Sequence, residues 1–201
     1  MNRRSFLLAP VALALLGSPA PAAGLSLAEI SDYLNGIGSA ETRFTQINDD
    51  GTTSTGRLLI RRPGRIRFEY DPPETALVMA GQGQVAVFDA RSNEPPERFP
   101  LVRTPLKLLL TEKVELQGQK MVVGLRADDD TTTVIAQDPK RPEYGRLHLV
   151  FANDPIALRR WIIEDGSGQR TTVILDGLKA SDKRLPGRLF DIKGEMARRG
   201  F

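Results

Sequence analysis

The sequence predicts a mainly β fold of the α+β class, with about ten or eleven antiparallel strands and a few short helices. Three observations carry this prediction. Segments with strand-like alternation of apolar and polar residues follow one another closely from residue 41 to residue 178. Turn-forming residues separate these segments, as at 49–51, 81–83, 128–130 and 165–168. Helical periodicity is confined to one segment before the strands and one short segment among them.

Residues 1–22 predict a cleaved secretory signal peptide, which leaves 23–201 as a single domain. Arg3 and Arg4 precede an apolar run that is too short for a bilayer span, which needs about 20 residues. Small residues up to Ala22 suit cleavage by a signal peptidase. The arginine pair also suits a twin-arginine signal, so the export route stays open. Either route predicts a periplasmic protein.

The composition excludes several classes of protein. Lysine plus arginine number 28 and aspartate plus glutamate 25, so outside the leader the chain is about neutral, and no field of one sign predicts nucleic-acid binding. The absence of cysteine excludes disulfides, cysteine-ligated metal sites and an acylated N-terminal cysteine. We therefore expect a soluble protein that is not itself a lipoprotein.

The first element is a helix in LSLAEISDYLNGIG, residues 25–38. Ser26 and Glu29 have the spacing of a capping box, and the glycines that follow the periodic residues predict where the helix ends. Its apolar stripe consists of Leu27, Ile30, Leu34 and Ile37.

The segment LLIRRPGRIRFEYDPP, residues 58–73, predicts two paired strands around the turn Pro63–Gly64. One face carries Leu58, Ile60 and Arg62 before the turn, and Ile66, Phe68 and Tyr70 after it. The other face of the second strand carries Arg65, Arg67 and Glu69. Arg62 on an apolar face is costly unless its donors find acceptors. It either reaches water at the rim of the sheet or bonds to free carbonyls at a helix end.

A second helical segment is predicted at 104–111, where Thr104 can cap, Pro105 suits the first position and LKLLLT follows. Because its leucines make it apolar nearly all round, it cannot lie on an open surface. It is either a plug in an ordinary core or a lid over an apolar cavity. The preceding stretch ARSNEPPERFPLVR predicts an irregular loop. Together with RIRFEYD, the predicted strand segments are ETRFTQIND, TGRLLIRR, ALVMA, QVAVFDA, VELQG, MVVGLRA, TTTVIAQD, RLHLVF, LRRWIIED and RTTVILDGL.

The inventory of reactive residues argues against an enzyme. His148 is the only histidine, and it alternates with leucines, so we expect it to face solvent. The triple aspartate at 128–130 lacks the spacing of a calcium loop, and GQGQ at 81–84 lies between strands instead of opening a helix. We expect no catalytic residue, no metal and no cofactor. The strand aromatics, Phe88 and Trp161 among them, fit either a filled core or a ligand cavity.

Five segments in order resemble the periplasmic outer-membrane lipoprotein carrier family, the LolA type. They are RFTQ at 43–46, GRLLIRRPGRIRFEY followed by PP at 72–73, LVMAGQGQVAVFD, LRRWIIEDGSGQRTTVIL and LPGRLFDI. The resemblance implies an incomplete, strongly curved antiparallel β-barrel, with short helices forming a lid over an apolar concavity. It also implies a soluble, monomeric periplasmic carrier that shields the acyl chains of lipoproteins.

The family further implies two partners, an inner-membrane lipoprotein-releasing ABC transporter and an outer-membrane lipoprotein receptor. Arg62 corresponds to the arginine that latches the lid in the family. The expected acyl-chain cavity consists of Leu58, Ile60, Ile66, Phe68, Tyr70, Phe88, Leu106, Leu109, Leu110 and Trp161. The alternatives are a periplasmic lipid- or lipoprotein-sensing module of the same fold and, less in keeping with the lone histidine, a hydrolase.

Overall fold

The computed structural model describes residues 24–201 except 90, 105 and 119. The predicted signal peptide and Pro105 therefore lie outside the described residues. The helices are α1 (Leu27–Gly36), α2 (Lys107–Leu110) and α3 (Ile192–Arg198), with short 3-10 turns η1 (Leu101–Arg103), η2 (Pro142–Tyr144) and η3 (Gly187–Phe190). The strands are β1 (Ser39–Ile47), β2 (Thr53–Arg61), β3 (Arg65–Tyr70), β4 (Leu77–Gly81), β5 (Gln84–Phe88), β6 (Glu97–Pro100), β7 (Val122–Ala127), β8 (Thr131–Gln137), β9 (Arg146–Ala152), β10 (Ala157–Glu164), β11 (Arg170–Leu175) and β12 (Lys179–Ala180).

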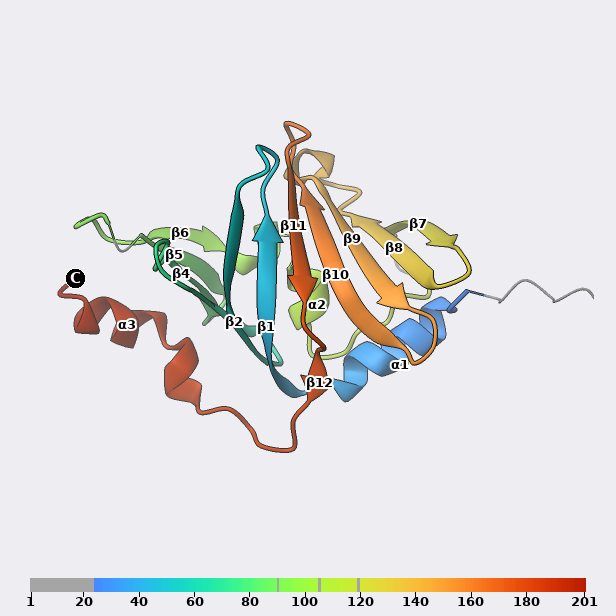
Figure 1. The fold of residues 1–201 in the computed structure, drawn as a ribbon, viewed down its shortest axis with the longest axis horizontal. Coiled ribbons are helices and arrows are strands. Elements are labelled where there is room, and N and C mark those ends of the chain that lie inside the picture. Colours follow the sequence, from blue (N-terminus) through green and yellow to red (C-terminus); the bar gives the residue numbers. More distant parts are fainter. Residues whose placement is uncertain (1–23, 90, 105, 119) are drawn as a thin grey trace, which may run out of the picture.

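All twelve described strands belong to one antiparallel sheet, in the order β6-β5-β4-β3-β2-β1-β11-β10-β9-β8-β7, with β12 paired to β1. Two meanders, β1 to β6 and β7 to β11, are joined where β1 pairs with β11. Among the described residues β6 and β7 form no pair, so the curved sheet stays open, as predicted (Figure 1).

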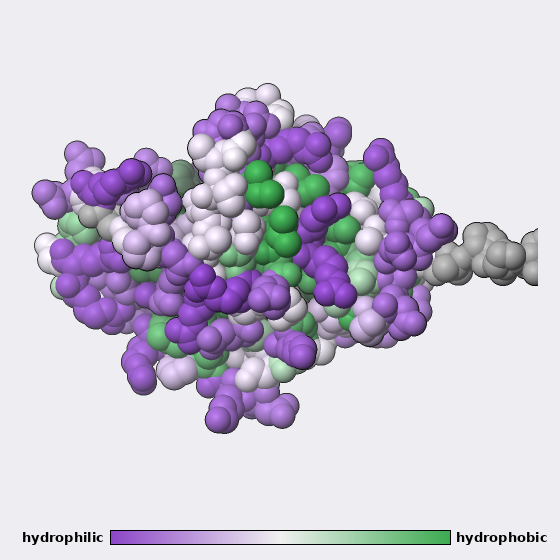
Figure 2. Space-filling view, in the orientation of Figure 1, coloured by the Kyte–Doolittle hydropathy of each residue, from purple (hydrophilic) through white to green (hydrophobic). Residues whose placement is uncertain are grey.

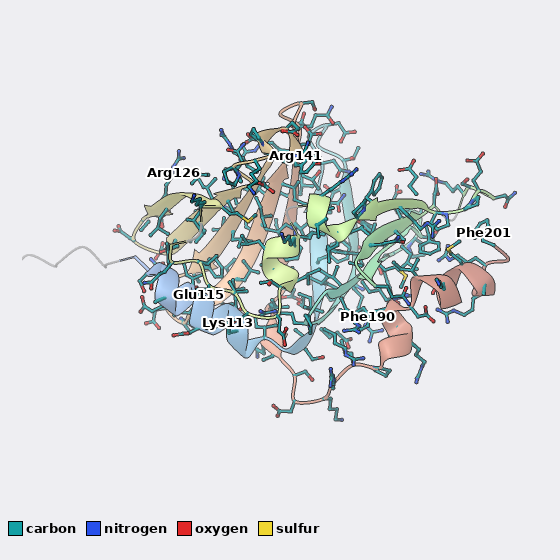
Figure 3. The ribbon with its side chains drawn as sticks, turned by 180° about the vertical axis from the view of Figure 1, so that it is seen from behind. Lys113, Glu115, Arg126, Arg141, Phe190 and Phe201 are labelled. Atoms are coloured by element: carbon teal, nitrogen blue, oxygen red, sulfur yellow. The ribbon has the colours of Figure 1, made fainter. Side chains whose placement is uncertain are left out.

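The two faces of the sheet carry different helices. We call the face that bears α1 and α2 the concave face, and the opposite face the convex face. Figure 3, seen from behind, shows α2 in front of the middle of the sheet, whereas α3 lies on the other side, beyond β4 and β5. The large core lies between the concave face and its two helices. A smaller cluster lies between the convex face and the C-terminal segment.

The β2–β3 hairpin has the register that alternation predicts. Leu58 is opposite Phe68, and Ile60 is opposite Ile66. All four side chains are buried in the large core. The tight turn contains Gly64 at φ +71°, a left-handed conformation that glycine adopts without strain. The predicted capping box of α1 is confirmed, because Ser26 accepts from the backbone N–H of Glu29 and the Glu29 side chain accepts from that of Ser26.

Three local predictions are wrong, and one short strand was missed. The segment VELQG is not a strand, because the N–H groups of Val114 and Leu116 donate to side chains of α1. The predicted irregular loop contains the edge strand β6, and the two-residue β12 was not predicted. The helix α2 begins at Lys107, and the Thr104 hydroxyl donates to the carbonyl of Leu101 instead of capping it.

The convex face is largely polar outside the region that the C-terminal segment covers. Figure 2 shows charged and polar residues over most of this face, with a small apolar area over β10 and β11. Ile174 of β11 is one of the exposed apolar residues there.

Candidate functional site

The floor of the candidate site is the apolar lining of the concave face. Leu58, Ile60, Ile66 and Phe68 come from the β2–β3 hairpin, and Trp161 comes from β10 on the other side of the β1–β11 junction. All five side chains are buried in one cluster. Strand alternation therefore brings residues that are a hundred positions apart onto one surface.

Aromatic rings connect the two halves of this floor. The ring centroid of Phe68 lies 5.3 Å from that of Phe44 and 6.1 Å from that of Trp161, both with edge-to-face geometry. The indole N–H of Trp161 is buried without a hydrogen-bond partner among the described residues. A buried donor without an acceptor indicates how apolar the surroundings of this ring are.

Tyr70 marks the polar margin of the floor. Its ring packs against the cluster with its centroid 5.1 Å from that of Phe44, while its hydroxyl donates to Oε1 of Gln46 over 2.6 Å. Burial, together with the charge of Glu74, raises the pKa of Tyr70 to about 12. The hydroxyl therefore stays protonated at any physiological pH.

The lid consists of α2 and the residues on either side of it. The side chains of Leu106, Leu109 and Leu110 are buried in the same cluster as the floor, as is Leu108. A one-turn helix has too few internal hydrogen bonds to be stable alone. Its position therefore depends on contacts with the floor and on bonds from the chain around it.

Arg62 provides most of those bonds. Its Nε and Nη2 donate to the carbonyl of Thr111 over 3.1 and 2.8 Å, and Nη2 also donates to that of Glu112 over 3.2 Å. Nη1 donates to the carbonyl of Leu34 in the last turn of α1. The guanidinium thus joins the β2–β3 turn, α1 and the end of the lid. These acceptors are helix-end carbonyls, the partners that sequence reasoning put forward for it.

Arg62 has no carboxylate partner: every carboxylate oxygen of the described residues lies more than 4.0 Å from its guanidinium nitrogens. Burial accordingly lowers its pKa from the ordinary value. A cation held only by carbonyl dipoles is less stabilised than one in an ion pair, and it costs less to separate from its partners. The backbone adds one more bond, from the N–H of Gly64 to the carbonyl of Leu110 over 2.7 Å.

A second connection between α1 and the lid was not predicted from the sequence. The side chain of Asn35 accepts from the N–H of Val114 over 2.9 Å and donates to its carbonyl over 2.8 Å. The hydroxyl of Ser31 accepts from the N–H of Leu116 over 3.0 Å. Polar residues on the inner side of an amphipathic helix are the signal that could have indicated these bonds.

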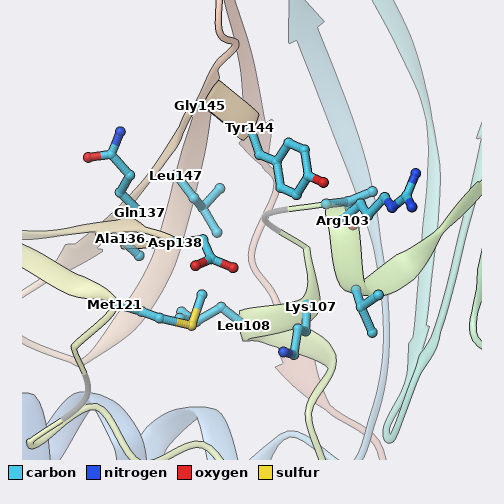
Figure 4. A pocket seen from close by; sticks show the side chains of 12 residues that line it. Arg103, Lys107, Leu108, Met121, Ala136, Gln137, Asp138, Tyr144, Gly145 and Leu147 are labelled. Atoms are coloured by element: carbon cyan, nitrogen blue, oxygen red, sulfur yellow. The ribbon is translucent and has the colours of Figure 1, made fainter. Parts of the chain in front are cut away.

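The margin of the lid next to β8 contains small openings. One, of about 20 Å³, lies between α2 and the end of η2. Figure 4 shows Lys107 of α2, Asp138 and Tyr144 around this opening, with Leu108, Met121 and Leu147 at its apolar side. A neighbouring depression of about 140 Å³ is lined by Leu108, Val114 and Met121, among others. A cavity of about 150 Å³ holds a benzene molecule, so neither space accommodates a long acyl chain.

Phe88 does not belong to this site, contrary to the prediction. It lies on the convex face in the smaller cluster with Leu77, Met79, Ala86 and Ile192. The guanidinium carbon of Arg199 is 5.0 Å from the centre of its ring. The segment VAVFD is apolar on both faces of β5, because α3 covers the convex side, and alternation therefore cannot assign its faces.

His148 is also less exposed than expected. Its side chain points away from Leu147 and Leu149 but is only 16% exposed, and Nε2 lies 3.8 Å from a carboxylate oxygen of Glu164. Burial lowers the pKa of His148; Glu164 opposes this, and nearby arginines add to it. In the described part of the chain, no three histidine, cysteine or acidic residues gather as potential metal ligands.

Comparison with known proteins agrees with this geometry. A family model described as "Outer membrane lipoprotein carrier protein LolA" matches residues 35–193, which is most of the chain. The chain belongs to the LolA family. A protein of Azotobacter vinelandii named outer-membrane lipoprotein carrier protein is 26% identical over 198 residues, covering 94% of this chain and 93% of the relative. A protein of the same name from Pseudomonas syringae pv. tomato is 24% identical over 172 residues, or 82% of each chain.

Among solved structures, a LolA superfamily protein from Nitrosomonas europaea is similar with a TM-score of 0.44 and 12% identity, covering 84% of this chain and 98% of that one. The LolA family is one of carriers and not of enzymes, in agreement with the inventory of reactive residues. Over the described residues, the helices are too short or too polar to cross a membrane.

Proposed function

We propose that this protein is a periplasmic carrier that binds the acyl chains of lipoproteins between the concave face of the sheet and its lid. The observation that carries the proposal is a continuous buried apolar floor under a one-turn helix that Arg62 holds by carbonyl bonds. Membership of the LolA family supports it. In the finer form of the proposal, the protein receives cargo from an inner-membrane releasing transporter and delivers it to an outer-membrane receptor.

The hydrophobic effect supplies the driving force for binding. Each methylene group of an acyl chain removed from water contributes about 0.8 kcal/mol, so chains of ordinary length are strongly driven into an apolar site. The floor offers buried leucine, isoleucine and aromatic side chains and, in Trp161, a donor that no water reaches. Such a site needs neither a catalytic group nor a cofactor.

The described conformation is the closed one, with the lid leucines occupying the space above the floor. Cargo therefore has to displace the lid and break the bonds of Arg62. Charge-assisted hydrogen bonds contribute about 1.5–3 kcal/mol each, so losing a few of them shifts a closed–open equilibrium by one or more orders of magnitude. The latch lowers the affinity for cargo and thereby allows a receptor to remove it.

Replacing Arg62 tests the latch directly. The Arg62→Leu variant should fold, bind a lipoprotein more tightly than the unmodified protein and release it to outer-membrane vesicles at least about tenfold more slowly. Arg62→Lys should fall between the two, since an ammonium group cannot reproduce the planar fork. Timed transfer of a labelled lipoprotein measures both effects.

Arg57→Leu is the matched control, because it makes the same substitution in the same hairpin but on the convex face, where Arg57 pairs with Glu41. Transfer by the Arg62→Leu variant at the unmodified rate would mean that Arg62 does not latch the lid. Binding without transfer by the unmodified protein would instead favour a sensing module of the same fold.

Site-specific photo-crosslinking tests which face binds the cargo. Crosslinkers at Phe68 and Leu109, which lie in the large core, should capture acylated cargo. A crosslinker at Arg67, on the opposite face of β3, should capture none. Equal capture at all three positions, measured by mass spectrometry of the adducts, would exclude the concave face as the specific site.

A further inference from the structure

The convex face of the β2–β3 hairpin carries a row of arginines with unequal partners. The register places Arg57 opposite Glu69, Leu59 opposite Arg67, and Arg61 opposite Arg65. Arg57 and Arg67 each have carboxylates within reach, at 2.7 Å from Glu41 and Glu69 respectively. The last pair of the row instead places two arginines side by side. Like charges directly across a sheet destabilise it unless something of opposite charge lies between them.

The C-terminal segment adds more positive charge at this place. Nη1 of Arg61 donates to the carbonyl of Leu185 over 2.9 Å, which fixes the 181–188 segment beside the hairpin end. Burial lowers the pKa of Arg61, and the nearby charges of Arg184 and Arg65 lower it further. The same segment passes so close that an added Cβ at Gly187 would lie 3.2 Å from Nη1 of Arg61. We call Arg61, Arg65 and Arg184 the arginine corner.

The charges of the arginine corner have no carboxylate partner among the described residues. Arg61, Arg65 and Arg184 have no carboxylate oxygen there within 4.0 Å; Asp182, the acidic residue of the 181–188 segment, pairs with none of them. Nε of Arg61 is buried and has no hydrogen-bond partner there either. A buried guanidinium N–H without an acceptor costs free energy that a bound oxyanion would recover.

We propose that the arginine corner binds phosphate groups, and that their source is the anionic phospholipid headgroups of a membrane surface. Neighbouring guanidinium groups without carboxylate partners suit the oxygens of a phosphate, which they can bind bidentately. Arg184 is exposed, so a headgroup can reach the corner from solvent.

The place of the corner in the fold fits contact with a surface. It lies at the end of the β2–β3 hairpin and beside the loop between β12 and η3, which extends below the sheet in Figure 1. The same hairpin end holds the lid on the concave face, through Arg62 and Gly64. A carrier that touches a membrane through the corner would thus present its lid end near the membrane. The inference does not depend on the acyl-chain site, because the corner is on the opposite face.

Vesicle sedimentation of the mature protein at low salt tests the inference. The protein should bind vesicles of phosphatidylcholine mixed with phosphatidylglycerol, and not vesicles of phosphatidylcholine alone. Arg65→Gln combined with Arg184→Gln should lower the partition coefficient at least about tenfold, given the attraction that each cation near an anionic surface provides. Arg61 is left in place because part of it is buried. Physiological salt should weaken the binding of the unmodified protein.

The matched control is Arg98→Gln combined with Arg126→Gln, which removes the same charge from two exposed arginines outside the corner. Equal losses in both double variants would overturn the inference, because general charge would then explain the binding. Titration with inorganic phosphate, followed by NMR of the arginine side chains, distinguishes the source. Phosphate binding at the corner without vesicle binding would support the phosphate site and overturn the membrane source. Binding of neither would overturn the whole inference.

Discussion

Two arginines of one hairpin hold the two helical covers of the sheet, and they do so with different chemistry. Arg62 reaches to the concave face and bonds the backbone carbonyls of α1 and the lid. Arg67 reaches to the convex face, where Nε donates to Glu69 over 2.7 Å and Nη1 lies 3.4 Å from Glu195 of α3. One arginine has dipoles as partners, and the other has charges.

The two helical covers also differ in how firmly they are attached to the sheet. The lid helix is one turn long and buries leucines, whereas α3 is preceded by Phe190, buried against the sheet, and its Glu195 accepts further bonds from Arg198 and Arg199. The segment lies so close to the sheet that a Cβ at Gly81 would come within 2.2 Å of the carbonyl oxygen of Phe190. We therefore propose that the concave cover opens more readily than the convex cover.

The largest expected effect comes from breaking the convex cover at its centre. Phe88→Ala removes a buried ring between β5 and α3 and should lower the free energy of unfolding by about 3–5 kcal/mol. The folded fraction should bind a fluorescent fatty acid as the unmodified protein does, because the concave floor is untouched. Urea denaturation and fluorescence titration measure the two quantities. A changed affinity with unchanged stability would reverse the roles assigned to the two faces.

The next effect comes from the charges of the same cover. Glu195 is buried, which raises its pKa, but hydrogen bonds from Arg198 and Arg199 and the charge of Arg67 together lower the pKa below the ordinary value. Glu195→Gln should therefore cost about 1.5–3 kcal/mol of stability at neutral pH. Because the folded-state pKa is lowered, this stabilisation is present above the ordinary pKa of a glutamate and is lost as the pH falls through the folded value.

Denaturation curves at neutral and acidic pH check this prediction. The difference in stability between the unmodified protein and the Glu195→Gln variant should shrink as the pH falls below about 4.5. A difference that stays constant with pH would show that the variant acts through its shape and not through its charge.

The smallest expected effect on stability concerns the second connection of the lid. Asn35→Ala removes two neutral hydrogen bonds to Val114, each worth about 0.5–1.5 kcal/mol. It also removes a long bond from Nη2 of Arg62, 3.3 Å from Oδ1 of Asn35, and leaves Arg62 with its backbone carbonyl partners. The lid should open more often, so amide hydrogens of residues 107–116 should exchange faster while those of α3 stay protected. If amide exchange became equally faster in the lid and in α3, the two covers would open together, and the lid would not be the less stable of the two.

Sequence patterns were sufficient to predict the orientation of an element wherever one of its faces is polar and the other apolar. The faces of β2 and β3, and with them the unusual position of Arg62, follow from alternation along LLIRRPGRIRFEY. The start of α1 follows from its capping box. Both are local properties, fixed by side chains within a few residues of one another.

Patterns failed wherever distant chain segments decide the outcome. Phe88 was assigned to the concave face because β5 is apolar on both sides, and only the position of α3 explains why. Val114 and Leu116 read as a strand, yet their N–H groups are satisfied by Asn35 and Ser31 of α1.

The sequence by itself therefore determined the class of the fold, the faces of its amphipathic strands and the resemblance to a carrier family. Only the tertiary structure decided which arginines have partners. Arg67 acquires Glu195 from more than a hundred residues away, and Arg62 acquires the end of the lid. Arg61 lies beside Arg65 and Arg184 with no carboxylate of the described residues in reach. The physical reason is that a charge is stabilised by whatever lies within a few ångströms of it, and that neighbourhood is set by how distant segments pack.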